Sequence, residues 1–317
     1  MVAIQKKVFK ISLLSFFLLI LSFYAHAQED LLQMAQDAGK TKDYVFATFK
    51  DTRIVNLQSI ETTKKNSLDF LVQHRFGNAG VDAFHGLLGL DASRDIRIAF
   101  NYGLTENLDL NIGRSKMNEL FDFGFKWRFL SQTADFKMPV SAALYMNGGL
   151  NAQSDASFYS GVTDNSFSKR FVHRFDYVTQ LIVASKINSK LSLELISSIY
   201  HRNFVKGALN PNTNVADENE LFSIGGGFRY KLTKRFAILA DYMYTFSAYR
   251  KDNPIFPYYQ PLSVGIEIET GGHVFHMYLS NSGGIRENNF IPNSPDSWGN
   301  GGYKLGFSIS RSFWLGN

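Results

Sequence analysis

Large aromatic residues alternate with charged or small residues along one short stretch of the chain. The sequence FDFGFKWRF, residues 121–129, has a ring at every second position, with Asp122, Gly124, Lys126 and Arg128 between the rings. Because successive side chains of a strand point to opposite faces, this period of two predicts a β-strand with an aromatic face and a charged face. The surroundings of these two faces indicate where the protein resides.

The same alternation recurs along most of the chain and predicts about 12 strands. We expect them at 67–76, 95–104, 108–115, 121–129, 140–148, 171–187, 191–204, 221–232, 236–247, 262–270, 273–281 and 303–313. Residues 44–60 are also strand-like. They predict either a first hairpin, which would give about 14 strands, or a segment folded into the interior. Residues 28–43 predict one short helix, capped by Asp30 and ended by Gly39.

Short and long connections alternate between the predicted strands. Tight turns are expected at 105–107, 188–190, 233–235 and 270–272, and long loops rich in Asn, Gly, Pro, Ser and Asp near 77–94, 149–170, 205–220, 248–261 and 282–302. Strands that follow one another in this way form an up-and-down antiparallel meander, which closes into a barrel. The sequence therefore predicts an all-β fold.

The number of aromatic residues decides which face of the barrel points outward. The chain has 29 Phe, 15 Tyr and 3 Trp, and rings from every strand would not fit inside a barrel of this size. On the outside they match the lipid-facing band of a membrane barrel, whose bulky rings gather at the strand ends. We therefore predict a transmembrane β-barrel with its charged face lining the lumen.

The N-terminal residues resemble an export signal. Lys6, Lys7 and Lys10 precede an apolar run from Ile11 to Phe23, and Ala25-His26-Ala27 follows as a small-x-small cleavage site. This is the layout of a cleaved signal peptide. We predict three regions: 1–27 as the signal peptide, 28–60 as an N-terminal helix and strand-like segment, and 61–317 as the barrel. The expected location is the cell outer membrane.

Net charge and cysteine content narrow the classes of function. The formal net charge is +5, and three of these charges lie in the predicted signal peptide, so the remaining charge gives no argument for nucleic-acid binding. The sequence contains no Cys, so we expect a fold without disulfides and no cysteine chemistry.

Several segments resemble a known family, the uncharacterised membrane-bound β-barrel domain family of outer-membrane bacteria. The matching pieces are YVFATFKDTRIVN, LDFLVQHRFG, NLDLNIGRS, LTKRFAILADYMY and SVGIEIETGGHVFHMYLSNS, spread over nearly the whole chain after the signal. The resemblance implies a barrel at the outer membrane. It implies no activity.

A His-Arg pair beside an aromatic residue occurs three times, in QHRF, VHRF and YHRNF. The strand pattern points each Arg inward at the end that carries the long loops, and each His outward. We expect a basic luminal mouth that favours anionic solutes, formed by Arg75, Arg174 and Arg202. The alternative is that these arginines form salt bridges with Asp69, Asp176 or Glu194, and that the histidines are ordinary interface residues.

No catalytic, metal or cofactor site is predicted. Glu269, His273 and His276 are possible ligands, but strand spacing does not make them converge. Ser197 and His201 share a face at a separation of about 13 Å, too far for a nucleophile and its base. The glycines at 225–227 have no phosphate-binding context and are expected to let a luminal segment approach the wall.

The leading functional interpretation is an outer-membrane barrel that passes or binds small solutes. Gly and Ser on the inner face favour a pore. Dense charges of both signs in the lumen favour the alternative, a non-conducting barrel that acts through its extracellular loops. A third class, a lipid-modifying barrel enzyme, lacks a visible catalytic pair. Expected partners are outer-membrane lipid, the barrel-assembly machinery and small anionic solutes.

Overall fold

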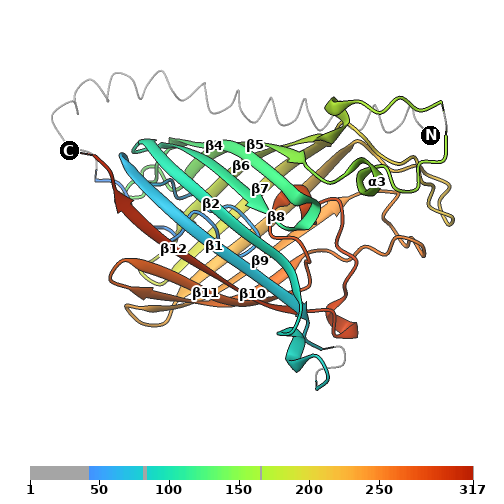
Figure 1. The fold of residues 1–317 in the computed structure, drawn as a ribbon. Coiled ribbons are helices and arrows are strands. Elements are labelled where there is room, and N and C mark those ends of the chain that lie inside the picture. Colours follow the sequence, from blue (N-terminus) through green and yellow to red (C-terminus); the bar gives the residue numbers. More distant parts are fainter. Residues whose placement is uncertain (1–42, 81–83, 165, 317) are drawn as a thin grey trace. The chain divides into compact units, whose positions relative to one another are not determined.

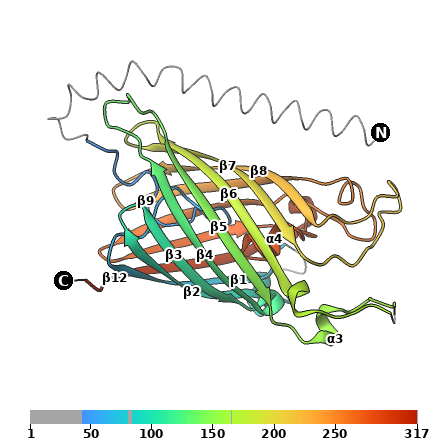
Figure 2. The same ribbon diagram turned by 90° about the horizontal axis from the view of Figure 1, so that it is seen from above.

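The chain forms one closed antiparallel β-barrel. The computed structural model describes residues 43–80, 84–164 and 166–316. Each strand pairs with its neighbours in sequence, and β1 pairs with β12 to close the barrel, as Figures 1 and 2 show. The prediction of an all-β up-and-down barrel is confirmed.

The strands agree closely with the alternating stretches of the sequence. They are β1 (Ser67–Asn78), β2 (Ser93–Thr105), β3 (Leu108–Ser115), β4 (Leu120–Leu130), β5 (Ser141–Asn151), β6 (Phe175–Lys186), β7 (Leu191–Arg202), β8 (Glu220–Lys231), β9 (Phe236–Phe246), β10 (Leu262–Thr270), β11 (His273–Ser280) and β12 (Lys304–Trp314). The barrel thus has 12 strands, and residues 44–60 do not add a hairpin to it.

Short helical turns occur in the connections. They are η1 (Leu87–Gly89), η2 (Met117–Glu119), α3 (Asp155–Phe158), η3 (Phe171–Arg174), α4 (Glu287–Phe290) and η4 (Trp298–Asn300). The expectation of strand from residue 171 onward is wrong for its first turn, because the Arg170 carbonyl accepts the His173 N–H and closes a 3₁₀ turn there. Among the described residues, no helix is long and apolar enough to cross a membrane. The predicted helix at 28–43 and the signal peptide fall almost wholly outside the described residues.

The two ends of the barrel differ. The connections β1–β2, β5–β6, β7–β8, β9–β10 and β11–β12 are long and lie at one end, which we call the loop end. The β2–β3, β6–β7, β8–β9 and β10–β11 connections lie at the other, which we call the turn end. The chain also enters β1 and leaves β12 at the turn end. The predicted alternation of short and long connections is therefore confirmed with two exceptions, the short β3–β4 connection at the loop end and the longer β4–β5 connection, 131–140, at the turn end.

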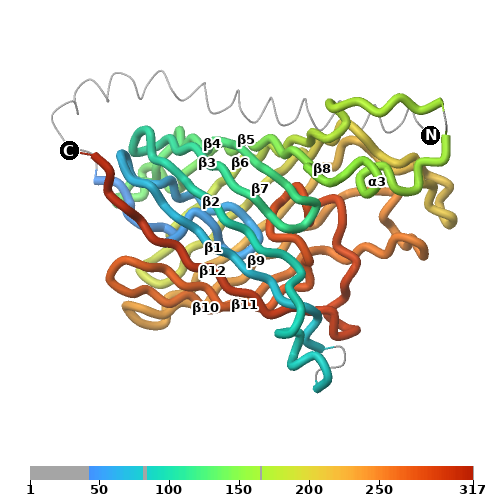
Figure 3. Tube along the Cα trace, in the orientation of Figure 1, coloured from blue at the N-terminus to red at the C-terminus, as the bar shows by residue number. Residues whose placement is uncertain are grey.

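The stretch FDFGFKWRF forms most of β4 and has the expected orientation. The Phe123 side chain faces outward and is 58% exposed, whereas Asp122 and Lys126 face inward and are at most 3% exposed. Low exposure inside a barrel of this size means that something other than open water fills the lumen. The tube in Figure 3 shows that the blue segment before β1 runs inside the barrel.

Candidate functional site

A short hairpin before the first strand occupies the lumen. All of residues 51–60, which we call the inner hairpin, are buried. Its turn closes with the Ile54 N–H donating to the Leu57 carbonyl, and its arms are joined by the Ser59 N–H donating to the Thr52 carbonyl, each at 2.9 Å. Of the two interpretations of residues 44–60, the structure bears out the segment folded into the interior.

A carboxylate of the barrel wall binds the tip of the inner hairpin. Asp241 on β9 accepts the backbone N–H groups of Val55, Asn56 and Leu57 at 3.0, 2.6 and 3.0 Å. A single carboxylate oxygen thereby satisfies three buried donors of an irregular turn that has no strand partner, which stabilises the turn inside the barrel.

Further inward charges bind the arms of the inner hairpin and the residues that follow it. The Lys126 ammonium on β4 donates to the carbonyls of Thr52, Ser59 and Glu61 at 2.8–2.9 Å. Glu194 on β7 accepts the Ile60 N–H at 2.8 Å. The charged face of the strands therefore lines a polypeptide segment, and its donors and acceptors replace the water that this backbone would otherwise need.

One side of the inner hairpin is apolar and packs on the wall. The Ile54 and Leu57 side chains lie against β8, where a Cβ at Gly227 would be 2.5 Å from Ile54 Cδ1 and a Cβ at Gly225 would be 3.1 Å from Leu57 Cδ1. The expectation that the glycines at 225–227 let a luminal segment approach is confirmed for Gly225 and Gly227.

A second insertion enters the lumen from the loop end. Residues 281–291, which begin the β11–β12 connection and which we call the inner loop, are all buried. Asp95 on β2 accepts the Ile285 N–H at 3.0 Å, and the Asn288 amide donates to Asp176 on β6 at 2.5 Å. Strand charges thus fix this insertion as they fix the inner hairpin.

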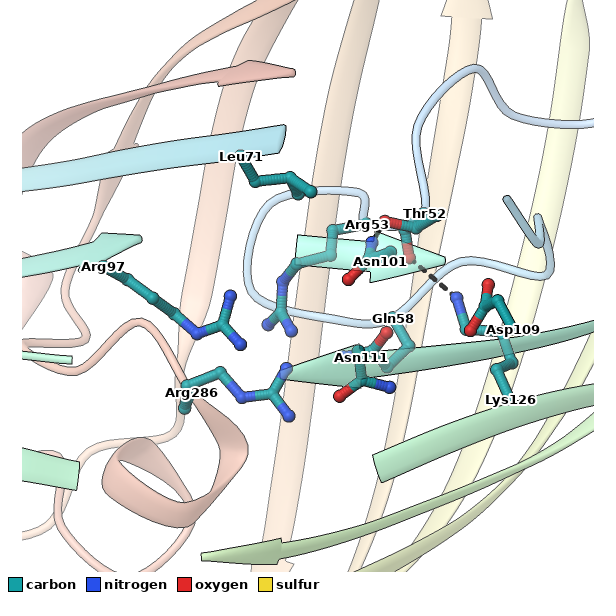
Figure 4. Close-up of a pocket in the computed structure, with 10 residues that line it drawn as sticks. All are labelled: Thr52, Arg53, Gln58, Leu71, Arg97, Asn101, Asp109, Asn111, Lys126 and Arg286. Carbon is teal, nitrogen blue, oxygen red and sulfur yellow. Dashed lines mark hydrogen bonds between the residues drawn. The ribbon is translucent and has the colours of Figure 1, made fainter. Parts of the chain in front are cut away.

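The two insertions meet at a cluster of buried charges, which we call the septum. It consists of Arg53 of the inner hairpin, Arg286 and Glu287 of the inner loop, and Arg97 and Asp122 of the wall. Ion pairs join Arg53 to Glu287 at 3.2 Å, Arg97 to Asp122 at 2.7 Å and Arg286 to Asp122 at 3.3 Å. Figure 4 shows the three guanidinium groups reaching the same small space from different elements.

The septum separates two larger cavities. The loop-end chamber has a volume of about 520 Å³ and is lined by residues that include Arg174, Arg202, Arg250, Asp217 and Tyr258. The turn-end chamber has a volume of about 620 Å³ and lies around residues 44–52 and 61–64. At the septum itself the cavity is about 10 Å³. The lumen is therefore closed in this conformation.

Of the three arginines predicted at the mouth, Arg75 lies deepest. Its guanidinium donates to Asn56 Oδ1 at 2.8 Å and to the carbonyls of Ser282 and Gly284 at 3.1 and 2.6 Å. It also lies over the Tyr278 ring. Arg75 thus joins the inner hairpin to the inner loop and does not line either chamber.

Arg174 and Arg202 are brought together, since both line the loop-end chamber. Arg174 is paired with Asp155 at 2.5 Å, and Arg202 with Asp217 at 2.7 Å. These carboxylates are in the loops, so the partners differ from the strand carboxylates considered as alternatives. Asp69, for example, accepts the Thr63 hydroxyl at 2.7 Å.

The three histidines have different surroundings. His74 on β1 stacks on the outward Phe307 ring, with centroids 5.6 Å apart, and His201 on β7 is hydrogen-bonded to Asn203. His173 lies in η3 and not on a strand, and stacks on Phe204 in the β7–β8 loop. The predicted outward, interfacial position therefore does not apply to His173.

The candidate metal ligands Glu269 and His276 have other partners. Glu269 pairs with Arg229 and Lys50, and His276 with Glu267. Across the described parts of the chain, no group of three or more His, Asp or Glu residues could hold a metal ion. Ser197 and His201 lie on β7, four residues apart, and His201 is within 3.5 Å of Glu220.

Sequence reasoning did not single out the residues of the septum. Arg53 and Arg286 lie outside the strands, and Glu287 is in a four-residue helix of a long loop. The inward carboxylates Asp122 and Asp241 were expected only to face the lumen. The signal that pointed to a filled lumen was the density of inward charges of both signs, which favoured the non-conducting alternative.

A closed antiparallel barrel with an apolar outer face and a polar interior has the arrangement of membrane-bound β-barrel proteins, whose interior is a water-filled channel in some and plugged in others. The chain belongs to the family described as membrane bound beta barrel domain (DUF5777), whose model matches residues 49–313. The match begins just before the inner hairpin, so the luminal segment is part of the family domain. No curated protein matches the chain.

Solved structures to which the chain is similar include two porins and one outer-membrane protein. The NanC porin is 9% identical, with a TM-score of 0.46 over 78% of this chain and 98% of that chain. The KdgM porin is 9% identical, with a TM-score of 0.44 over 78% and 99%. Omp33 of Acinetobacter baumannii is 8% identical, with a TM-score of 0.39 over 81% and 100%.

Proposed function

We propose that the protein is a non-enzymatic outer-membrane channel, exported by a signal peptide ending at Ala27, that binds small anionic solutes in its loop-end chamber and passes them when the septum opens. The observation that carries this proposal is the pair of chambers, about 520 and 620 Å³, on opposite sides of a polar septum. A barrel that served only as a scaffold would not need a chamber at each end.

The charge of the loop-end chamber supports an anionic solute. Its lining contains Arg174, Arg202, Lys206 and Arg250, against the carboxylates of Asp176 and Asp217. Asp155 and Glu218 pair with Arg174 and Arg250 but lie outside this lining, so the excess of positive charge belongs to the chamber surface and not to the whole region. Positive groups on the surface of a narrow, low-dielectric opening raise the local concentration of anions.

The packing of the inner hairpin supports a channel that is closed at rest. The side chains of Phe49, Ile54, Val55, Leu57 and Ile60 are at most 2% exposed. Exposing each would cost about 1.5–3 kcal/mol, so complete withdrawal would cost roughly 10 kcal/mol without compensation. The same observation favours a second candidate, a non-conducting barrel that binds ligands or partners through its loops.

Conductance in a planar bilayer separates the two candidates. Because the chain has no Cys, Asn56→Cys with Ser263→Cys can lock the inner hairpin to β10, where Asn56 Nδ2 donates to Ser263 Oγ at 2.8 Å. We expect rare openings of the native protein, none when the lock is oxidised, and recovery after reduction. A variant lacking residues 44–60, with its folding checked by heat-dependent gel mobility, should conduct steadily.

Two results would contradict the proposal, the first by removing the gate and the second by removing the channel. One is current through the oxidised lock equal to that of the native protein, which would remove the inner hairpin as the gate. The other is the absence of current from the native protein, from the folded variant without residues 44–60 and from a folded variant that also lacks the inner loop, which together would establish the non-conducting barrel. Arg174→Ser with Arg202→Ser should reduce anion preference, measured as reversal potential in a salt gradient.

A further inference from the structure

The charges of the septum do not balance. Arg53, Arg97 and Arg286 contribute three positive charges, and their ion-pair partners Asp122 and Glu287 contribute two negative ones. All five side chains are at most 4% exposed. Since a buried charge without a partner is strongly unfavourable, one further negative charge is expected among the three guanidinium groups.

Other charges near the septum do not supply it. Lys126 and Asp109 also line the small cavity and attract each other, so as a pair they add no net charge. Glu194 on β7 also attracts Lys126 and accepts the Ile60 N–H, and among the described residues it forms no ion pair with the three arginines. With Lys126, Asp109 and Glu194 included, the charges of the wider region balance. The excess therefore stays local to the guanidinium groups.

Hydrogen-bond donors at the septum also lack partners. The Nε atoms of Arg53, Arg97 and Arg286 are buried and have no hydrogen-bond partner among the described residues. Asp122 Oδ2 is also buried without a hydrogen-bond partner, but this one oxygen is not bonded to any of the three donors. Buried donors in this situation are rare, and three of them on three converging arginines indicate a further acceptor.

The cavity between these residues has a suitable size for a single small particle. Its volume is about 10 Å³, the space needed for one water-sized particle. Figure 4 shows the three guanidinium groups directed to this region, with Gln58, Asn101 and Asn111 as neutral polar neighbours. Polyatomic oxyanions such as sulfate are too large for it.

We propose that the septum binds one monovalent, monoatomic anion, with chloride as the ion present under ordinary conditions. The anion accepts hydrogen bonds from the guanidinium groups of Arg53, Arg97 and Arg286, and so joins the inner hairpin, the wall and the inner loop. This site is independent of conduction, since a permanently closed barrel would bind the ion equally well.

Thermal unfolding of the detergent-purified protein tests the site. Sodium chloride is exchanged for sodium gluconate at constant ionic strength, because gluconate is too large for the cavity. We expect the midpoint of the native protein to rise with chloride and to saturate, as mass action on the folded state requires. Equal midpoints in the two salts at every concentration would overturn the proposal and leave water in the cavity.

Two variants should change chloride affinity in opposite directions. Arg97→Gln removes the excess charge, and we expect half-saturation at a chloride concentration at least tenfold higher. Asp122→Asn increases the excess, and we expect half-saturation at a several-fold lower concentration. Arg114→Gln, an outward arginine with 45% side-chain exposure, should behave like the native protein. Affinity that falls equally in both septum variants would contradict an anion held by charge.

Bromide gives a second measurement that needs no variant. Crystals of the native protein grown in bromide should show an anomalous peak between Arg53, Arg97 and Arg286. Anomalous bromide peaks at other sites of the protein, with no peak at the septum, would overturn the proposal. This result does not depend on whether the protein conducts.

Discussion

The inward charged residues of the strands act mainly on the backbone of the two insertions. Asp241 accepts three N–H groups of the hairpin tip, and Lys126 donates to three carbonyls. Irregular backbone in the lumen has no strand partner, and these side chains replace one. Charged residues on the inner face of such a barrel are thus fold-determining residues, in addition to any effect on solutes.

The two inward glycines of β8 allow a test at a single residue. Gly227→Val would overlap Ile54, which is completely buried, and we expect it to destabilise the protein by about 1–3 kcal/mol through overpacking. It should also make residues 51–60 more sensitive to protease. The matched control is Gly226→Val, which points to the opposite face, where a Cβ would lie 3.1 Å from the Glu194 carbonyl oxygen and 3.3 Å from Leu195 Cδ2. Because this face has no insertion packed on it, we expect a smaller loss of about 1 kcal/mol or less. Equal losses of stability in Gly227→Val and Gly226→Val would contradict the packing of Ile54 against Gly227.

Residue patterns predicted the strands better than the contents of the lumen. The alternation in FDFGFKWRF depends only on neighbouring residues, and it gave β4 to within one residue at each end. The inner hairpin depends on Asp241, which is 186 positions from Val55. No local pattern shows whether an inward charged side chain contacts water or the backbone of a luminal segment. For this reason Arg75 was expected to line an open mouth, whereas it binds the two insertions.

At the scale of elements, the inner hairpin and the inner loop stabilise each other. They come from opposite ends of the barrel, and their contact includes the Arg53–Glu287 ion pair and the hydrogen bond from the Gln58 amide to Glu287 at 3.1 Å. Arg75 binds both. Movement of either insertion therefore breaks contacts of the other.

This contact predicts a pH dependence of stability. Burial would raise the pKa of Glu287, but Arg53 and Arg286 outweigh it, so the pKa lies below its usual value. A carboxyl with a lowered pKa in the folded state stabilises the protein above its unfolded pKa of about 4.3, and this contribution is lost as pH falls through the folded pKa. The contact should therefore remain intact at pH 5 and weaken only below about pH 4.

Glu287→Gln is the variant that tests this dependence. We expect it to lower stability by about 3 kcal/mol at neutral pH, because it leaves buried arginines without a charged partner. Thermal midpoints of both proteins should converge as pH falls below about 4. A difference that stays constant from pH 7 to pH 3 would mean that the charge of Glu287 has no part in the stabilisation.

At the scale of the whole molecule, the outer surface determines the surroundings of the protein. Large apolar side chains are exposed on nearly every strand, with rings among them on β2, β4, β6, β8, β9 and β12, while charges are buried inside. This is the reverse of a water-soluble barrel. The outward position of the apolar face was predictable from the sequence, because the aromatic rings are too many to fit inside a barrel of this size. The closed state was not, since it depends on contacts between distant segments.

Depth in the membrane gives a further prediction. Phe125→Arg, at the middle of β4, should destabilise the folded barrel by about 2–4 kcal/mol, measured by denaturant unfolding in lipid vesicles. Phe129→Arg, near the turn end of the same strand, should cost about 1 kcal/mol or less. Gly124 is not a usable control, because a Cβ there would overlap the Met146 carbonyl oxygen. Equal costs at 125 and 129 would contradict the assignment of the strand as a membrane span.

The position of the inner hairpin in the chain has a consequence for how the molecule assembles. The hairpin precedes every strand, yet its ligands are on β4, β7 and β9, and the barrel closes only when β1 pairs with β12. Contacts between such distant segments form slowly because long loops must first be closed. The hairpin must lie inside before β1 pairs with β12. We therefore expect the strands to assemble around the inner hairpin, and the β1–β12 pairing to be the final step of folding.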